Sequence, residues 1–163
     1  DNSSARMARV KENLARTGLS AKIVIADALT HQGQYDAVLL DAPCSATGTM
    51  RRHPDLPFAK DGSGFADLIA LQTDLLTHAW SLVNPGGRLV YCTCSLLPDE
   101  GEVQIEEALP QHQDMRPDHA ARDLPGVEPI WHSEEGGLRL RPDYWADKGG
   151  MDGFYVAALR KDS

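Results

Sequence analysis

The stretch YDAVLLDAPCSATG, residues 35–48, carries most of the information about the fold of this 163-residue chain. Residues 35–40 form a mostly apolar run that predicts a buried strand, and Asp41 and Cys44 follow where that strand ends. The stretch RLVYCTCS, residues 88–95, repeats the pattern and places Cys94 after a second apolar run. Ligands of open α/β sheets bind at the carboxyl ends of the strands. Two thiols and an acid at such a rim therefore indicate a chemical site.

The rest of the chain alternates between helical and extended patterns. A first helix begins at a cap formed by Ser3 or Ser4 and ends at Gly18. Residues 22–26 predict a strand ending at Asp27, residues 98–109 a helix, and residues 153–159 a closing strand. A long helix is expected to bury the stripe Leu68, Leu71, Leu75, Ala79 and Leu82, and a turn at residues 84–87 ends it.

This alternation predicts an α/β fold with a mostly parallel sheet that is covered by helices on both faces. Asp27, Asp41 and Cys94 would then lie on one rim of that sheet. An acid at a strand end is also a common turn residue, so the convergence of all three carries more weight than any one of them.

Composition excludes several function classes. The sequence shows no signal peptide and no apolar run long enough to cross a bilayer, and its three cysteines are an odd number. We therefore expect a cytoplasmic protein without a membrane partner. The formal net charge of -8 argues against a grip on nucleic acid by overall charge, so any such contact must be local.

Three motifs carry a family resemblance. They are DAPCSATGTMRRHPD at residues 41–55, PGGRLVYCTCSLLPDE at residues 85–100 and MDGFY at residues 151–155. Together they resemble the S-adenosylmethionine-dependent RNA cytosine-C5 methyltransferases. The sequences SATG and RRHPD within the first motif are most similar to the bacterial Sun/Fmu (RsmB) branch, which modifies 16S ribosomal RNA. The resemblance implies a Rossmann-like methyltransferase sheet, mostly parallel with an antiparallel C-terminal strand.

The resemblance also implies roles for individual residues. Cys94 is expected to be the nucleophile that adds to C6 of the target cytosine, and Cys44 is expected to help release the adduct. Asp41 is expected beside both the cofactor and the base. For the cofactor, S-adenosylmethionine, Asp1 is expected at the ribose hydroxyls and Asp27 near the adenine.

In this family, a glycine-rich cofactor motif and an RNA-binding region would lie before Asp1. Residues 1–163 are therefore expected to be a partial catalytic domain, the carboxyl-terminal part of a longer protein. Such a piece, lacking sheet strands, is expected to be inactive alone and to bind cofactor weakly. It is also expected either to self-associate or to pack residues 22–26 in a position that differs from the family's.

Several residues have two readings. The charged residues Arg51, Arg52 and His53 are candidates for RNA contact, or they form a solvated loop. Cys92 is expected to be a small buried thiol. A thiol metal or redox protein is one alternative function, although the cysteine spacing lacks the pairs of a zinc site, and no metal is expected. A non-catalytic RNA-binding or assembly module is the other.

Overall fold

The computed structural model describes residues 1–59 and 62–163. The chain divides into two compact units, residues 1–33 and residues 34–163. In the described residues, no helix has the length and apolar character needed to cross a membrane.

The first unit is built around one helix. Helix α1, Ser4–Thr17, begins at Ser3, whose Oγ accepts a hydrogen bond from the Arg6 N–H, and ends at Gly18 in the left-handed conformation with φ 68°. Both ends are as predicted. The predicted strand at residues 22–26 is wrong, because the segment forms no β-ladder and leads into the 3₁₀ turn η1, Ala28–Thr30. A strand needs a neighbour to pair its backbone groups, and the described residues of this unit offer no other strand.

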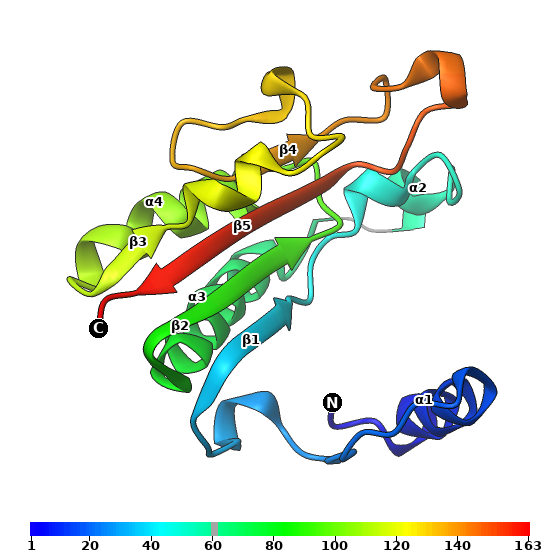
Figure 1. Ribbon diagram of the computed structural model, residues 1–163. Helices are drawn as coiled ribbons and strands as arrows, with labels where there is room; N and C mark the ends of the chain where they lie inside the picture. Colours follow the sequence, from blue (N-terminus) through cyan, green and yellow to red (C-terminus); the bar gives the residue numbers. More distant parts are fainter. Residues whose placement is uncertain (60–61) are drawn as a thin grey trace. The chain divides into compact units, whose positions relative to one another are not determined.

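The second unit contains a five-stranded mixed sheet (Figure 1). Its strands are β1 Tyr35–Asp41, β2 Val83–Thr93, β3 Met115–Pro117, β4 Leu138–Leu140 and β5 Phe154–Lys161. The order is β1-β2-β5-β3, and β4 also pairs with β5. Strands β1 and β2 are parallel, whereas β5 runs antiparallel to β2, β3 and β4. The α/β class and the antiparallel C-terminal strand are confirmed.

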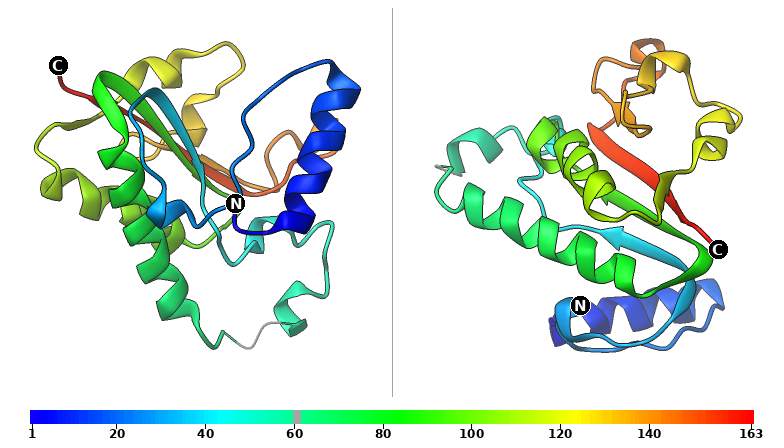
Figure 2. Two further views of the ribbon diagram at one scale, coloured as in Figure 1. Left: turned by 90° about the horizontal axis from the view of Figure 1, so that it is seen from below. Right: turned by 90° about the vertical axis from the view of Figure 1, so that its left-hand side faces the viewer.

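Helices α3, Phe65–Ser81, and α4, Glu102–Gln111, lie along one face of this sheet (Figure 2). The short helix α2, Leu56–Ala59, precedes α3. The 3₁₀ turns of this unit are η2 Thr47–Thr49, η3 Pro98–Glu100, η4 His119–Asp123, η5 Pro129–Trp131 and η6 Ala146–Lys148. The core between helices and sheet is formed by Leu76, Trp80, Leu89, Tyr91, Ile105, Tyr155 and Leu159.

Three details of the second unit differ from the sequence prediction. Leu71 of α3 is exposed, and Gln72 takes the buried position instead. Strand β1 is less buried than predicted, since it has a strand neighbour on one side only and Leu39 is 70% exposed. Residues 84–87 do not separate helix from strand but lie within β2, where the register against β1 is irregular.

Candidate active site

The parallel pairing of β1 and β2 brings the two cysteine motifs to one rim. Asp41, the last residue of β1, pairs with Cys92 of β2, and the Ala42 N–H donates to the Cys92 carbonyl at 3.0 Å. Cys44 follows β1 and Cys94 follows β2, and their Sγ atoms are 3.4 Å apart. The structure thus joins three predicted site residues, Asp41, Cys44 and Cys94, although fifty residues of chain separate the two thiols.

Cys44 is held in its protonated form at neutral pH. Burial, partly offset by a hydrogen bond from the backbone at Ala46, raises the pKa of the Cys44 thiol to about 12. The neighbouring Cys94 sulfur and the Glu100 carboxylate add to the rise. Cys44 therefore has a proton to donate across the 3.4 Å sulfur–sulfur contact.

Cys92 is buried, as predicted, and contacts Asp41. Its Sγ lies 3.8 Å from Asp41 Oδ1. Burial, followed by the negative charge of Asp41, raises the pKa of Cys92 to about 11, so Cys92 is a thiol that donates to the carboxylate. This contact fixes one oxygen of Asp41 and gives Cys92 a supporting part in the site.

Two glycines allow the cysteine loops to approach the segment before β5. The Gly48 N–H donates to the Cys94 carbonyl at 2.9 Å, and the Gly153 N–H donates to the Gly48 carbonyl at 2.8 Å. A Cβ on Gly48 would lie 2.0 Å from the Gly153 oxygen. Gly153 of the MDGFY motif therefore lies where the backbone of three separate segments meets.

The three candidate RNA-contact residues lie beside the same segment. Arg51 Nη2 donates to the Gly149 carbonyl at 2.7 Å, and Arg52 forms an ion pair with Asp152 at 2.6 Å. This hydrogen-bonded pairing lowers the pKa of Asp152. The Arg52 side chain is still 61% exposed, and His53 is exposed too. Both guanidinium groups brace the loop before β5 while their charges face solvent.

The acids expected at the cofactor lie in the first unit. Asp1 Oδ1 accepts from the Ser3 N–H at 2.8 Å and from Arg6 Nη2 at 3.0 Å. Asp27 Oδ1 accepts from the Leu29 N–H at 2.9 Å, which makes it the cap of η1. The Ala26 N–H donates to the Asp1 carbonyl at 3.2 Å, so the two acids belong to one locus.

Each of these carboxylates is anchored through Oδ1, and the Asp1 side chain is 31% exposed. They therefore fit a ligand that offers hydroxyl or amino donors. Asp41, the third acid expected at the cofactor, lies in the second unit.

Sequence reasoning did not identify Glu100 as part of the site. The sequence places Glu100 only within the helix predicted at residues 98–109, but the side chain is fully buried against the Cys44 loop. A signal was available: Glu100, Gln104 and Ala108 recur at intervals of four residues, and all three are buried. Glu100, Gln104 and Ala108 thus face inward, whereas the acids Glu106 and Glu107 of α4 are exposed.

The thiol metal alternative requires several ligand side chains gathered at one place. Within residues 1–59 and 62–163, no three His, Cys, Asp or Glu side chains form a group suited to a metal ion. All three cysteines are free thiols.

Residues 1–160 match the family model described as 16S rRNA methyltransferase RsmB/F. Curated relatives include proteins named ribosomal RNA small subunit methyltransferase B from Pasteurella multocida, 38% identical over 172 residues, and from Vibrio cholerae, 39% identical over 166 residues. Each alignment covers 99% of this chain but 36% and 35% of the respective relative. The chain thus spans about a third of the length of these proteins.

Solved structures show the same likeness. A methyltransferase homologue from Pyrococcus horikoshii is 32% identical with a TM-score of 0.69, over 99% of this chain and 52% of that one. NSun6 from the same organism, solved with an S-adenosylmethionine analogue, is 26% identical with a TM-score of 0.80, over 100% of this chain and 40% of that one.

Proposed function

The chain belongs to the 16S rRNA methyltransferase RsmB/F family, and from this premise we propose that the protein methylates C5 of a cytosine in 16S ribosomal RNA with S-adenosylmethionine as methyl donor. The observation that carries the proposal is the pair of thiols, Cys44 and Cys94, whose Sγ atoms are 3.4 Å apart at the rim where β1 ends in Asp41. A binding module needs neither thiol, whereas cytosine C5 chemistry uses one thiolate for addition and can use a second thiol in release.

The chemistry requires a nucleophile because C5 of cytosine is unreactive by itself. Addition of the Cys94 thiolate to C6 forms a carbon–sulfur bond and moves electron density to C5, which then attacks a methyl group. S-adenosylmethionine, when bound, would supply that electrophilic methyl and leave as the neutral thioether S-adenosylhomocysteine, since the sulfur–methyl bond breaks with its electrons on sulfur. Cys44, which remains protonated near neutral pH, suits the proton-donating part in release.

Release reverses the addition. The C5 proton passes to solvent, the electron pair of that C–H bond forms the C5–C6 double bond, and the carbon–sulfur bond breaks with its electrons on Cys94. Cys44 is placed to donate its S–H to the departing sulfur across 3.4 Å, which stabilises the thiolate that forms. Asp41, held by Cys92, is assigned to N3 of the base.

The cofactor and RNA contacts follow the same premise. Asp1 would accept from the ribose hydroxyls and Asp27 from the adenine amino group, each through the carboxylate oxygen opposite its anchored Oδ1. Arg51, Arg52 and His53 would meet RNA phosphates next to the cysteines, a local contact that suits an acidic chain.

The decisive experiment compares the two cysteines in the complete protein. With 16S ribosomal RNA from cells lacking the gene, Cys94→Ala should abolish methyl transfer. Cys44→Ala should accumulate a protein–RNA adduct that survives a denaturing gel, because release is impaired. The matched control is the double variant, which should lose the adduct. An adduct with Cys94→Ala and none with Cys44→Ala would reverse the roles, and methyl transfer by Cys94→Ala at the normal rate would exclude the covalent mechanism.

A further inference from the structure

We propose that Glu100 is a positioning residue, whose buried side chain locks the Cys44 loop against the Cys94 loop and thereby sets the spacing of the two thiols. Its expected effect on turnover rests on the proposed function. The positioning itself rests on contacts within residues 34–163.

The Glu100 side chain fixes the Cys44 loop by accepting hydrogen bonds from it. It is fully buried. Its Oε1 accepts from the Ser45 N–H at 2.7 Å and from Gln72 Nε2 at 3.0 Å, and its Oε2 accepts from Ser45 Oγ at 2.5 Å. Gln72 in turn donates to the Pro43 carbonyl at 2.8 Å. The residues on both sides of Cys44 are thus tied, directly or through Gln72, to one carboxylate.

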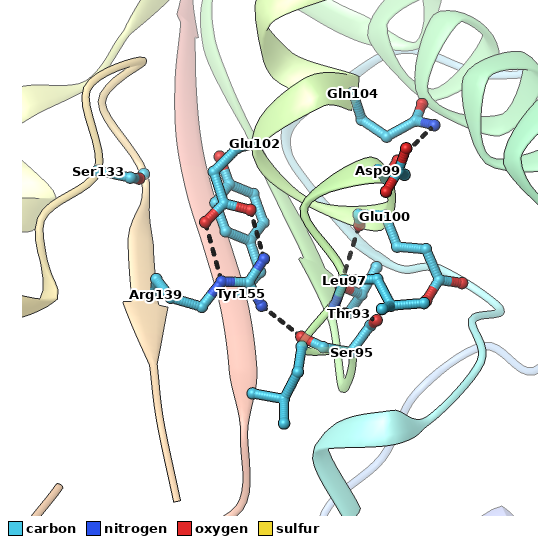
Figure 3. Close-up of polar contacts among 12 residues, drawn as sticks. Thr93, Ser95, Leu97, Asp99, Glu100, Glu102, Gln104, Ser133, Arg139 and Tyr155 are labelled. Carbon is cyan, nitrogen blue, oxygen red and sulfur yellow. Dashed lines mark hydrogen bonds and ion pairs between the residues drawn. The ribbon is translucent and has the colours of Figure 1, made fainter. Parts of the chain in front are cut away.

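The backbone of Glu100 holds the strand that leads to Cys94. Its carbonyl accepts from the Tyr91 hydroxyl at 3.0 Å and from Thr93 Oγ1 at 3.1 Å (Figure 3 shows the bond from Thr93). Tyr91 and Thr93 are both fully buried in β2. One residue therefore grips both cysteine segments, the first through its side chain and the second through its main chain.

A chain of mostly buried hydroxyl groups completes the connection between the two loops. Ser95 Oγ lies 3.3 Å from Ser45 Oγ and 3.1 Å from Thr47 Oγ1, and Thr47 Oγ1 accepts from the Leu96 N–H at 2.9 Å. Ser45 follows Cys44 and Ser95 follows Cys94. The residues that follow the two cysteines are thus hydrogen-bonded to each other, and Ser45 also donates to Glu100.

A comparison with Glu102, two residues along the chain, separates this role from ordinary packing. Glu102 forms an ion pair with Arg139, whose Nη1 donates to the Ser95 carbonyl (Figure 3). Among the described residues Glu100 forms no ion pair, and neutral N–H and O–H donors alone compensate its burial. Burying a carboxylate without a cation costs stability, a cost that proteins typically accept where function requires it.

The first test measures spacing without any RNA. Diamide oxidises two neighbouring thiols, which lose two protons and two electrons to the reagent as one S–S bond forms. In the protein as it exists, the Cys44–Cys94 disulfide should form readily, because the sulfurs are 3.4 Å apart. Glu100→Gln, which turns one accepting oxygen into an N–H donor facing Ser45, should slow that reaction by roughly tenfold.

The matched control is Gln104→Leu. Gln104, in α4, is 2% exposed but bonds to Thr73 and to the main chain of Ile69 and Asp99 rather than to the cysteine loops. It should lose thermal stability but keep the rate of disulfide formation. If Glu100→Gln does not fold, Ser45→Ala, which removes the 2.5 Å bond, takes its place. Rates equal to the control for the folded variant would overturn the proposal.

The second test measures turnover in the complete protein. Glu100→Gln should lower kcat by roughly 10- to 100-fold and leave KM for S-adenosylmethionine within about twofold of wild type. A loss shared equally by Gln104→Leu would show a merely structural role for Glu100. If the wild type transfers no methyl group, the proposed function fails, and the disulfide rates still decide whether Glu100 positions the thiols.

Discussion

The three cysteines differ in what surrounds each sulfur. Cys44 lies next to the Cys94 sulfur and is affected by the negative charge of Glu100, whereas Cys92 lies next to the carboxylate of Asp41. Burial is the largest cause of the raised pKa of both thiols. Since a thiolate is the reactive form, these two thiols are protected near neutral pH. Burial thus keeps Cys44 and Cys92 in the thiol form near neutral pH.

Alkylation measures this protection. With a pKa of about 12, against 9.0 for an ordinary thiol, Cys44 should react with iodoacetamide at pH 8 roughly 1000-fold more slowly than in the urea-denatured chain. Cys92, with a pKa of about 11, should be slowed less. Peptide mapping by mass spectrometry gives the rate for each cysteine. Cys44 labelled at the denatured rate at pH 8 would contradict the assignment.

At the level of elements, the rim depends on close contact between loops rather than on the strands alone. The loop after β1, the loop after β2 and the segment before β5 meet at Gly48 and Gly153. Because backbone atoms form this contact, no side-chain rotation can relieve a clash there.

Gly48→Ala should therefore separate the loops. The added Cβ would meet the Gly153 carbonyl at 2.0 Å, and we expect a loss of roughly 1–3 kcal/mol in unfolding free energy together with slower Cys44–Cys94 disulfide formation. The control is Gly126→Ala, where nothing lies within 4 Å of the new Cβ but φ is 91°. That variant should lose about 1 kcal/mol through backbone strain and keep the disulfide rate. Urea titration of both variants gives the comparison.

At the scale of the whole molecule, the stability of the fold depends on buried thiol and phenol groups that lose their protons only at high pH. Burial raises the pKa of Cys44, Cys92, Tyr91 and Tyr155 above the ordinary values of 9.0 for Cys and 10.0 for Tyr. Below pH 9 these groups are protonated in both states, and their contribution to stability is fully present. Above it, the unfolded chain releases protons that the folded chain retains, so stability is lost as pH rises.

Urea unfolding followed by circular dichroism should therefore show a midpoint that falls steadily between about pH 9 and 11. Tyr155→Phe, which removes one titrating group, should reduce the slope above pH 10 even though it also loses the hydrogen bond to Glu135. A midpoint that stays constant from pH 8 to pH 11 would contradict the cited shifts.

Association is the second expectation at this scale. Strand β1 is at an edge of the sheet, and its Leu39 side chain is 70% exposed. Unpaired edges and apolar faces promote self-association, so light scattering of residues 1–163 should give a mass above that of the monomer. Leu39→Lys should shift the mass towards the monomer, and Leu124→Lys, at an exposed site outside the strands, should not. A monomer at all concentrations would exclude this expectation.

The same chain is expected to bind S-adenosylmethionine weakly in a calorimetric titration. Binding at low micromolar strength, roughly -8 kcal/mol, would show that residues 1–163 suffice for the cofactor.

Local interactions account for the features that could be predicted from the sequence. The caps of α1 at Ser3 and Gly18 act within a few residues, and an apolar run followed by a polar turn marks β1 and β2. The sequence motifs indicated the family and the two thiols.

Long-range contacts fixed the features that the sequence did not predict, because burial depends on partners far away in the chain. Residues 22–26 have strand character but no ladder, Gln72 displaces Leu71 from the core because it reaches Pro43 and Glu100, and Glu100 turns inward to a serine 55 residues before it. The four-residue spacing of Glu100, Gln104 and Ala108 can indicate an inner face, but it does not identify hydrogen-bond partners 28 and 55 residues away. The support beneath the two cysteines therefore emerged only from the folded chain.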